Sequence, residues 1–228
     1  MLNWGHLQVP NIALKELVIC WPRSQFNIMR WIFKLKIGIP SAMNLVEPIR
    51  SLSKIAEFSD ALKEQPRNYL MFILGIHTGL RISDILNLKV SDVRDKERIR
   101  LKEKKTGKEK TFPIPEAVKP LIQEYVKGKD NEDYLFKSRE GKNKPITRFQ
   151  AYILLNNRGK AVGLSGIGTH TLRKTFGYHH YKKFKDVALL MNIFNHSSPS
   201  VTMKYIGISQ DEMDRSMASF SLFIDETI

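Results

Sequence analysis

The apolar segment between Pro66 and Gly79 constrains the fold more than any other part of this sequence. Proline is favoured at the first position of a helix and glycine just after its end, so the segment predicts a buried helix over residues 67–77. Its apolar run, residues 69–76, is far shorter than the roughly 20 residues that a membrane-spanning helix needs. Because the whole chain is 42% apolar and 26% charged, we expect a water-soluble globular protein without a membrane segment.

Cap and turn residues elsewhere predict more helices and one small sheet. Residues 98–101 and 110–114 have the character of two short strands, and the polar stretch between them, centred on Thr106-Gly107, is typical of a β-hairpin tip. The fold class that these patterns predict is mainly α with a small antiparallel β-sheet (α+β). Further helices are expected at residues 82–88, 115–126, 147–161, 170–183, 186–194, 199–204 and 210–218.

The composition changes near residue 43. All three tryptophans and the single cysteine, Cys20, precede it, and residues 1–42 show neither helical nor strand periodicity. We therefore hypothesise a poorly ordered basic and apolar extension over residues 1–42, a compact domain over 43–218 and an apolar tail over 219–228. One cysteine permits neither an intrachain disulfide nor a cysteine-based zinc cluster, which is consistent with a reducing cytosol.

The charge balance favours a polyanionic partner. The chain has 37 lysines and arginines against 23 acidic residues, a formal net charge of +14. Each phosphate that a protein neutralises releases condensed counterions, so basic proteins bind nucleic acids readily. A generic basic surface would give the same balance, so charge alone leaves both interpretations open.

Two arginines and a histidine occupy positions suited to holding a phosphate. Attack on a phosphodiester without a metal requires fixed positive charge, a nucleophile, and an acid for the departing oxygen. Arg81 follows Thr78-Gly79-Leu80 at the entry to a helix, where anions bind readily. His170 and Arg173 lie three residues apart, so they share one helix face and could grip one phosphate.

Three further residues complete a possible site. His196 precedes Ser198-Pro199, which is a typical helix start, and Tyr205 lies at the far end of that helix. This spacing can bring the two side chains to opposite sides of a shared cavity. Lys105 stands at the predicted hairpin tip, where an ammonium group could reach DNA.

Each of these residues also has an interpretation without chemistry. Arg81 could be solvated, Lys105 could belong to a charge run, and His170 with Arg173 could be an incidental pair. Tyrosines mostly serve in packing. The histidines could instead bind a metal, but no H-E-x-x-H pattern is present and the adjacent His179 and His180 point to different faces of a helix, so we expect no metal and no other cofactor. The stretch 178–183 could be a basic and aromatic surface that contacts DNA.

Taken together, these segments resemble the tyrosine recombinase (phage integrase) family over about residues 55–217. Any one segment is a weak match, but all of them in the family's order form a specific signal. The first runs from Thr78 to Leu88 (TGLRISDILNL), the second from His170 to Phe176 (HTLRKTF) and the third from Asn195 to Tyr205 (NHSSPSVTMKY), with Lys105 in the hairpin between the first two.

The resemblance implies a tyrosine recombinase catalytic-domain fold and a role for each matching residue. Tyr205 would attack the scissile phosphate and become joined to the 3′ end of the cut strand, while Arg81 and Arg173 hold the non-bridging oxygens. Lys105 would protonate the departing 5′ hydroxyl. His170 would assist proton transfer at Tyr205, and His196 would donate a hydrogen bond to the phosphate. Asp84 would support the structure.

The resemblance also implies partners. These are double-stranded DNA and further copies of the chain, as a tetramer on DNA, in the cytoplasm at the nucleoid. The terminal apolar stretch 220–224 would dock on a neighbouring copy or on its own domain. Residues expected near the DNA backbone are Lys104, Lys108, Lys174, Lys182 and Lys183.

Two residues and one region depart from the family pattern. Asn195 stands where glycine is frequent, and Lys174 where many members have a second histidine. Residues 1–54 do not resemble the helical DNA-binding domain that usually precedes the match. We therefore expect a site-specific recombinase or integrase, with two alternatives: a type IB topoisomerase-like activity that relaxes supercoils, or a non-catalytic DNA-binding remnant.

Overall fold

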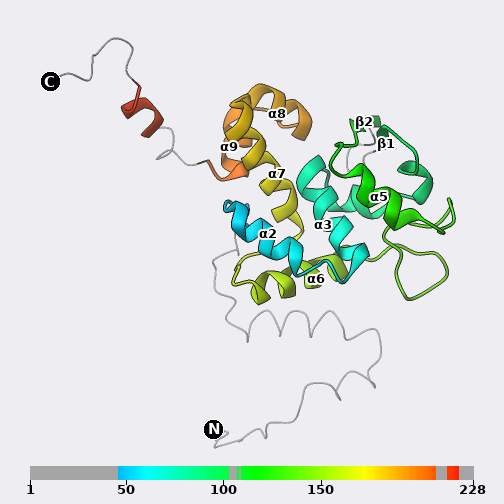
Figure 1. Ribbon diagram of the computed structural model, residues 1–228. Helices are drawn as coiled ribbons and strands as arrows, with labels where there is room; N and C mark the ends of the chain where they lie inside the picture. The colour runs from blue at the N-terminus through cyan, green and yellow to red at the C-terminus, as the bar shows by residue number, and fades with distance from the viewer. Residues whose placement is uncertain (1–45, 103–106, 108, 209–214, 221–228) are drawn as a thin grey trace, which may run out of the picture. The chain divides into compact units, whose positions relative to one another are not determined.

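The computed structural model describes residues 46–102, 107, 109–208 and 215–220 (Figure 1). The predicted extension over residues 1–42 lies outside this part of the chain, as do residues 221–228 of the predicted tail. The division of the chain into three parts therefore stays a prediction. None of the helices among the described residues is long and apolar enough to cross a membrane.

The fold is mainly helical with a two-stranded antiparallel sheet, which confirms the predicted class. The labelled α-helices are α2 (Leu52–Asp60), α3 (Pro66–Thr78), α4 (Ile82–Leu86), α5 (Lys119–Val126), α6 (Arg148–Ala161), α7 (Thr169–Phe184), α8 (Val187–Phe194) and α9 (Pro199–Ile206), and residues 215–218 are also helical. A 3₁₀ turn, η2 (Val90–Asp92), leads towards the strands β1 (Arg98–Lys102) and β2 (Glu109–Pro113).

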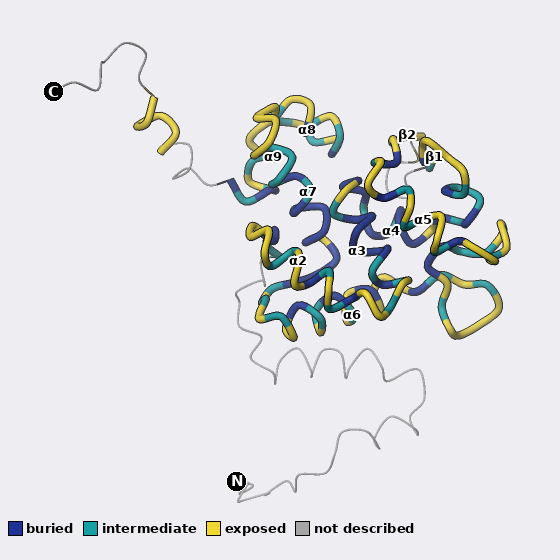
Figure 2. The backbone as a smooth tube through the Cα atoms, viewed as in Figure 1, coloured by how far each residue is buried: buried dark blue, intermediate teal, exposed yellow. Residues whose placement is uncertain are grey.

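Helix α3 lies at the centre of the core, as its apolar sequence predicts. Every side chain from Leu70 to Leu74 is buried, and Figure 2 shows α3 as a mostly buried tube among more exposed helices. Pro66 begins the helix, and Gly79 ends it in the left-handed conformation with φ of 62°. The α3 and α7 backbones lie close together at Gly75, where an added Cβ would be 2.6 Å from Leu172 Cδ1. This close packing fixes α7 against the most buried element of the fold.

The hairpin of β1 and β2 is attached to the helices at its base. Arg98 pairs with Pro113 and Leu101 with Lys110, and Ile99 is fully buried against the core. The Lys110 Nζ atom donates to the Ile193 carbonyl at 3.3 Å, which links β2 to α8. Residues 103–106 and 108, which include the predicted hairpin tip, lie outside the described part of the chain.

The last three helices pack around a small hydrophobic cluster of their own. Leu190 and Phe194 of α8 meet Ile206 of α9 and Ile208 after it. Asp186 caps α8 by accepting from the Leu189 amide, and Ser198 caps α9 by accepting from the Val201 amide. These caps fix where α8 and α9 begin.

The segment ahead of α2 holds the end of α9. Its Ile49 amide donates to Thr175 Oγ1 on α7 at 2.9 Å, and the Arg50 guanidinium donates to the Gly207 carbonyl at 2.9 Å. Gly207 ends α9 with φ of 76°. The chain just before α2 therefore ties α7 to the C-terminal end of α9.

Some predicted helix bounds differ from the structure. The helix predicted from residue 115 begins at Lys119, because Pro120 has no amide hydrogen and is accommodated only in the first turn. Residues before it form turns, with the Val118 amide donating to the Pro115 carbonyl at 2.8 Å. Helix α2 was not predicted. The helix predicted to end at residue 204 continues to Ile206, so Tyr205 lies within its last turn.

Candidate active site

Helix α7 holds a buried arginine at the centre of the site. Arg173 is only 5% exposed, and its guanidinium donates to the carbonyls of Gly79 and Phe194, the latter at 3.0 Å. Its Cζ atom also lies 4.3 Å from the centre of the Phe194 ring. Because the two carbonyls belong to the ends of α3 and α8, the fold itself fixes the orientation of this cation.

Three more positively charged or ionisable residues surround a cavity next to Arg173. The cavity has a volume of about 380 Å³, and its lining includes Arg81, Arg148, His170 and Arg173. Arg81 directly precedes α4 in an extended conformation, and Arg148 is the first residue of α6. Asp84 of α4, predicted to be a supporting residue, is buried. The cavity is therefore lined with groups that attract an anion such as phosphate.

Tyr205 lies where this cluster meets α9. Its hydroxyl oxygen is 3.2 Å from His170 Nδ1, within hydrogen-bond distance. Its ring meets the His196 ring edge-to-face at 5.1 Å between centroids, and the Phe194 ring at 5.5 Å. The Tyr205 hydroxyl is thus in direct contact with one imidazole, which could accept its proton, and a second imidazole lies beside its ring.

Burial sets the protonation states of these three groups. Burial raises the pKa of the Tyr205 hydroxyl, and nearby Arg173 and Arg81 offset only part of this rise. Burial also lowers the pKa of both imidazoles, and Arg173 and Arg81 lower them further; for His170, Arg148 has the larger effect among the cations. At neutral pH we therefore expect a protonated phenol next to a neutral imidazole that can accept its proton.

Lys174 lies over the Tyr205 ring and is largely shielded from solvent. Its side chain is 9% exposed, and its Nζ atom lies 5.4 Å from the centre of the Tyr205 ring. Burial lowers the pKa of this ammonium, and Glu47 acts in the opposite direction. The residue expected near the DNA backbone is thus positioned to support the Tyr205 ring.

The structure brings together most of the predicted site residues. Arg81, His170, Arg173, His196 and Tyr205 converge, although His196 and Tyr205 touch instead of facing each other across a cavity. Lys182 and Lys183 are exposed on α7. Lys104, Lys105 and Lys108 lie outside the described residues, so their predicted roles stay predictions.

Two residues near the site were not predicted. Arg148 lines the cavity, and its only sequence signal is its place directly after Thr147, the predicted helix cap. Thr202 is fully buried, and its hydroxyl lies 3.1 Å from His196 Nδ1. The sequence gives even less indication of Thr202, because its contact with His196 depends on the position of Thr202 along α9.

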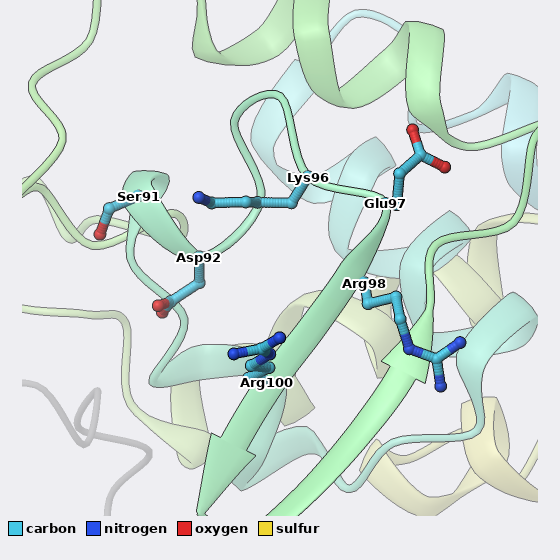
Figure 3. Close-up of a pocket in the computed structure, with 6 residues that line it drawn as sticks. All are labelled: Ser91, Asp92, Lys96, Glu97, Arg98 and Arg100. Carbon is cyan, nitrogen blue, oxygen red and sulfur yellow. The ribbon is translucent and has the colours of Figure 1, made fainter.

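A second hollow of the described domain does not offer the same chemistry. A hollow of about 460 Å³ beside β1 is lined by Asp92, Lys96, Glu97, Arg98 and Arg100, and Figure 3 shows Lys96 extending towards Ser91 and Asp92. It contains a mixture of charges and no histidine, tyrosine or cysteine. In the described part of the chain, no group of three or more His, Cys, Asp or Glu side chains could hold a metal ion.

Comparisons with known proteins agree on one family. Residues 50–212 match the model of the phage integrase family. The probable integrase/recombinase YoeC of Bacillus subtilis is 52% identical over 170 residues, covering 74% of this chain and 93% of YoeC. The tyrosine recombinase XerA of Pyrococcus furiosus is 28% identical over 163 residues, covering 70% of this chain but only 57% of XerA.

Solved structures share the fold. The crystal structure of XerA recombinase superposes with a TM-score of 0.63 and 20% identity, covering 77% of this chain and 65% of that one. A lambda integrase tetramer bound to a Holliday junction gives a TM-score of 0.54 and 19% identity, covering 68% of this chain and 46% of that one. The chain thus spans about half to two thirds of these longer recombinases and nearly all of YoeC.

Proposed function

We propose that this chain, which belongs to the phage integrase family of tyrosine recombinases, cuts and rejoins DNA through a covalent link to Tyr205. The observation that carries the proposal is the 3.2 Å contact between the Tyr205 hydroxyl and His170 Nδ1 beside the buried Arg173. A phenol with a raised pKa needs a base in contact with it to become a nucleophile, and this arrangement supplies one.

The proposed reaction begins with attack on the scissile phosphate. The Tyr205 oxygen forms a bond to phosphorus while its proton passes to His170, and the bond from phosphorus to the 5′ oxygen breaks. Arg81 and Arg173 stabilise the charge on the non-bridging oxygens. The fixed orientation of the Arg173 guanidinium, which donates to the Phe194 carbonyl, supports this role. The proton that the 5′ oxygen needs is assigned to Lys105 by the family resemblance.

Rejoining reverses these steps. A 5′ hydroxyl attacks the phosphotyrosine and gives its proton back to the group that supplied it, Lys105 in the proposed assignment, while the Tyr205 oxygen leaves with the proton that His170 returns. The phosphodiester energy is kept in the covalent link, so the cycle is balanced without a further energy source. When the attacking hydroxyl belongs to a second duplex, the result is strand exchange.

The proposed partners are double-stranded DNA and other copies of the chain. A net charge of +14 and the cavity lined by Arg81, Arg148 and Arg173 support a DNA substrate, which would place the protein at the nucleoid in the cytoplasm. Lys182 and Lys183, exposed on α7, are proposed to contact the DNA backbone. The tetramer of lambda integrase supports a tetramer of this chain during strand exchange.

Covalent trapping tests the proposal. The protein is incubated in EDTA with nicked duplexes that lose the 5′ fragment after cleavage, and the products are separated on a denaturing gel. We expect a DNA–protein adduct that Tyr205→Phe abolishes. Tyr181→Phe, which alters another tyrosine of the same small hydrophobic cluster, serves as the matched control and should keep the adduct. An adduct that persists in Tyr205→Phe would contradict the proposal.

A second assay separates recombination from relaxation. A supercoiled plasmid without a recombination site would be relaxed by a topoisomerase-like enzyme, whereas a site-specific recombinase should leave it supercoiled. Two plasmids that carry the trapped sequence should exchange strands. Relaxation without exchange would favour the topoisomerase-like alternative.

A further inference from the structure

The ring of His196 is held by a buried hydroxyl on the helix that carries Tyr205. Thr202 on α9 is 0% exposed, and its Oγ1 lies 3.1 Å from His196 Nδ1. The same oxygen lies 3.3 Å from the Ser198 carbonyl. The backbone amide of His196 donates to the Met191 carbonyl at 3.0 Å, so both the main chain and the ring of His196 are fixed.

The position of the Thr202 hydroxyl proton decides which group donates in the contacts with His196 and Ser198. A threonine hydroxyl has a single proton, and a carbonyl oxygen can only accept. If Thr202 donates to Ser198, its oxygen can accept from His196, and all three groups are satisfied. If Thr202 donates to His196 instead, its oxygen faces the Ser198 carbonyl lone pairs at 3.3 Å without a proton between them. Buried polar groups favour the first arrangement, because each bond in such a chain strengthens the next.

We infer that Thr202 is a positioning residue that holds His196 in the tautomer with the proton on Nδ1, which leaves the Nε2 lone pair for the active site. No hydrogen-bond partner of Nε2 is found among the described residues. The consequence for catalysis rests on the proposed function. A neutral His196 in this tautomer cannot donate a hydrogen bond from Nε2 to a phosphate. It donates only as an imidazolium, after taking one proton from solvent.

The charged neighbours of His196 make this proton uptake depend on the substrate. Arg173 of α7 and Arg81 ahead of α4 both lower the pKa of His196, in addition to the larger effect of burial. Tyr205 of α9 faces its ring as a neutral phenol. At neutral pH and without DNA we therefore expect a neutral imidazole, and an incoming phosphate supplies the negative charge that stabilises its protonated form. Substrate binding should be accompanied by protonation of His196.

Nuclear magnetic resonance of the full chain tests the tautomer without requiring activity. At about pH 8, above the usual imidazole pKa, long-range ¹⁵N–¹H spectra distinguish a protonated Nδ1 from a protonated Nε2. The chain has six histidines, and the signals lost in His196→Gln identify the ring. We expect a protonated Nδ1 in the unsubstituted protein. A protonated Nε2 there would overturn the inference, whatever the variants do.

Two substitutions of Thr202 complete the test. Thr202→Val removes the hydroxyl at nearly constant shape and should shift His196 towards the Nε2-protonated form, while Thr202→Ser keeps the hydroxyl and should preserve the Nδ1 form. An unchanged tautomer in a folded Thr202→Val would also overturn the inference. Unchanged signals of the other five histidines would show that Thr202→Val is folded. If Thr202→Val does not fold, the tautomer seen in the unsubstituted protein and in Thr202→Ser still decides whether the inference holds.

The rate of adduct formation gives a second readout. In the unsubstituted protein we expect the rate to fall as pH rises, because the imidazolium is lost. Thr202→Val should cleave about tenfold more slowly, which corresponds to one hydrogen bond to a charged group, and its rate should fall less steeply with pH. An equally steep fall in a folded Thr202→Val would count against proton uptake by His196. If no variant forms an adduct, the proposed function fails while the NMR result still stands.

Discussion

Arg148 adds an exposed cation to the cavity that already holds Arg81, His170 and Arg173. No acidic partner of Arg148 is found in the described part of the chain. Arg148 lines the same cavity as His170, and among the charged groups it has the largest effect in lowering the pKa of His170. An unpaired arginine in such a position is suited to a phosphate next to the scissile one.

Replacing Arg148 should weaken DNA binding without changing its sequence preference. We expect Arg148→Gln to lower the slope of log K against log salt by about 0.9, the value for one phosphate contact in duplex DNA. Fluorescence anisotropy across a salt series measures the slope. Lys160→Gln, an equal charge change at the other end of α6, is the matched control. If both variants changed the slope equally, a specific contact by Arg148 would be excluded.

At the level of the elements, the position of Tyr205 depends on how closely α9 packs against α7. Gly177 of α7 permits this packing: an added Cβ would lie 2.7 Å from Ile206 Cγ2 and 2.8 Å from the Phe194 ring. Both neighbours adjoin the site, since Ile206 follows Tyr205 in the chain and the Phe194 carbonyl accepts a hydrogen bond from Arg173. A side chain at position 177 must therefore move the nucleophile, the buried arginine, or both.

Gly177→Ala should reduce cleavage more than it reduces stability. Overpacking costs about 1–3 kcal/mol, of which about 1 kcal/mol is offset by the better helix propensity of alanine. Cleavage should fall by roughly 10- to 100-fold, because a displacement of about 1 Å can cost that much. Gly159→Ala on α6 is the control, since its Cβ would lie 2.7 Å from Ile167 Cγ1, away from Tyr205. Urea unfolding and covalent trapping measure the two effects, and equal loss of cleavage in both variants would contradict the argument.

Local sequence signals predicted the elements well where a cap or a breaker marked their ends. Pro66 and Gly79 bounded α3, Thr147 capped α6 with Gln150, and Ser198 with Pro199 began α9. The departure at Asn195 is also understandable, because the residue ends α8 with φ of 55°, a conformation that asparagine tolerates better than most residues. These features depend on a few neighbouring residues, so a sequence can reveal them.

Features that depend on contacts between distant residues could not be predicted in the same way. The burial of Lys174 against Tyr205 results from the packing of α7 on α9, and the cavity position of Arg148 from the packing of α6 near α4 and α7. Neither contact is indicated by a periodicity or a helix cap in the sequence. Spacing alone grouped His170 with Arg173 and His196 with Tyr205, whereas the gathering of all five residues, with Arg81, was specified by the family resemblance.

Across the whole described domain, burial leaves several imidazoles poorly suited to carrying charge. The pKa values of His170, His180 and His196 are all lowered, in each case mainly by burial, and cations add to the effect at His170 and His196. The same basic surroundings that attract a phosphate thus disfavour protonation of the empty site. Binding affinity and stability of the free protein are therefore linked through these groups.

The free protein should lose stability when it is acidified. At pH values between the lowered histidine pKa values and the ordinary value of about 6.5, the unfolded chain binds protons that the folded chain does not. The folded state therefore has its full stability above this pH window and loses stability as the pH decreases through it. We expect the urea midpoint to drop from about pH 7.5 to about pH 5.5. His180→Asn, which alters the imidazole in tilted contact with Phe176 and Phe184 and leaves the site residues in place, should make this drop smaller. A midpoint that stays level on acidification would mean that the two states bind equal numbers of protons, and a rising midpoint would mean that the folded chain binds more; either result would contradict the prediction.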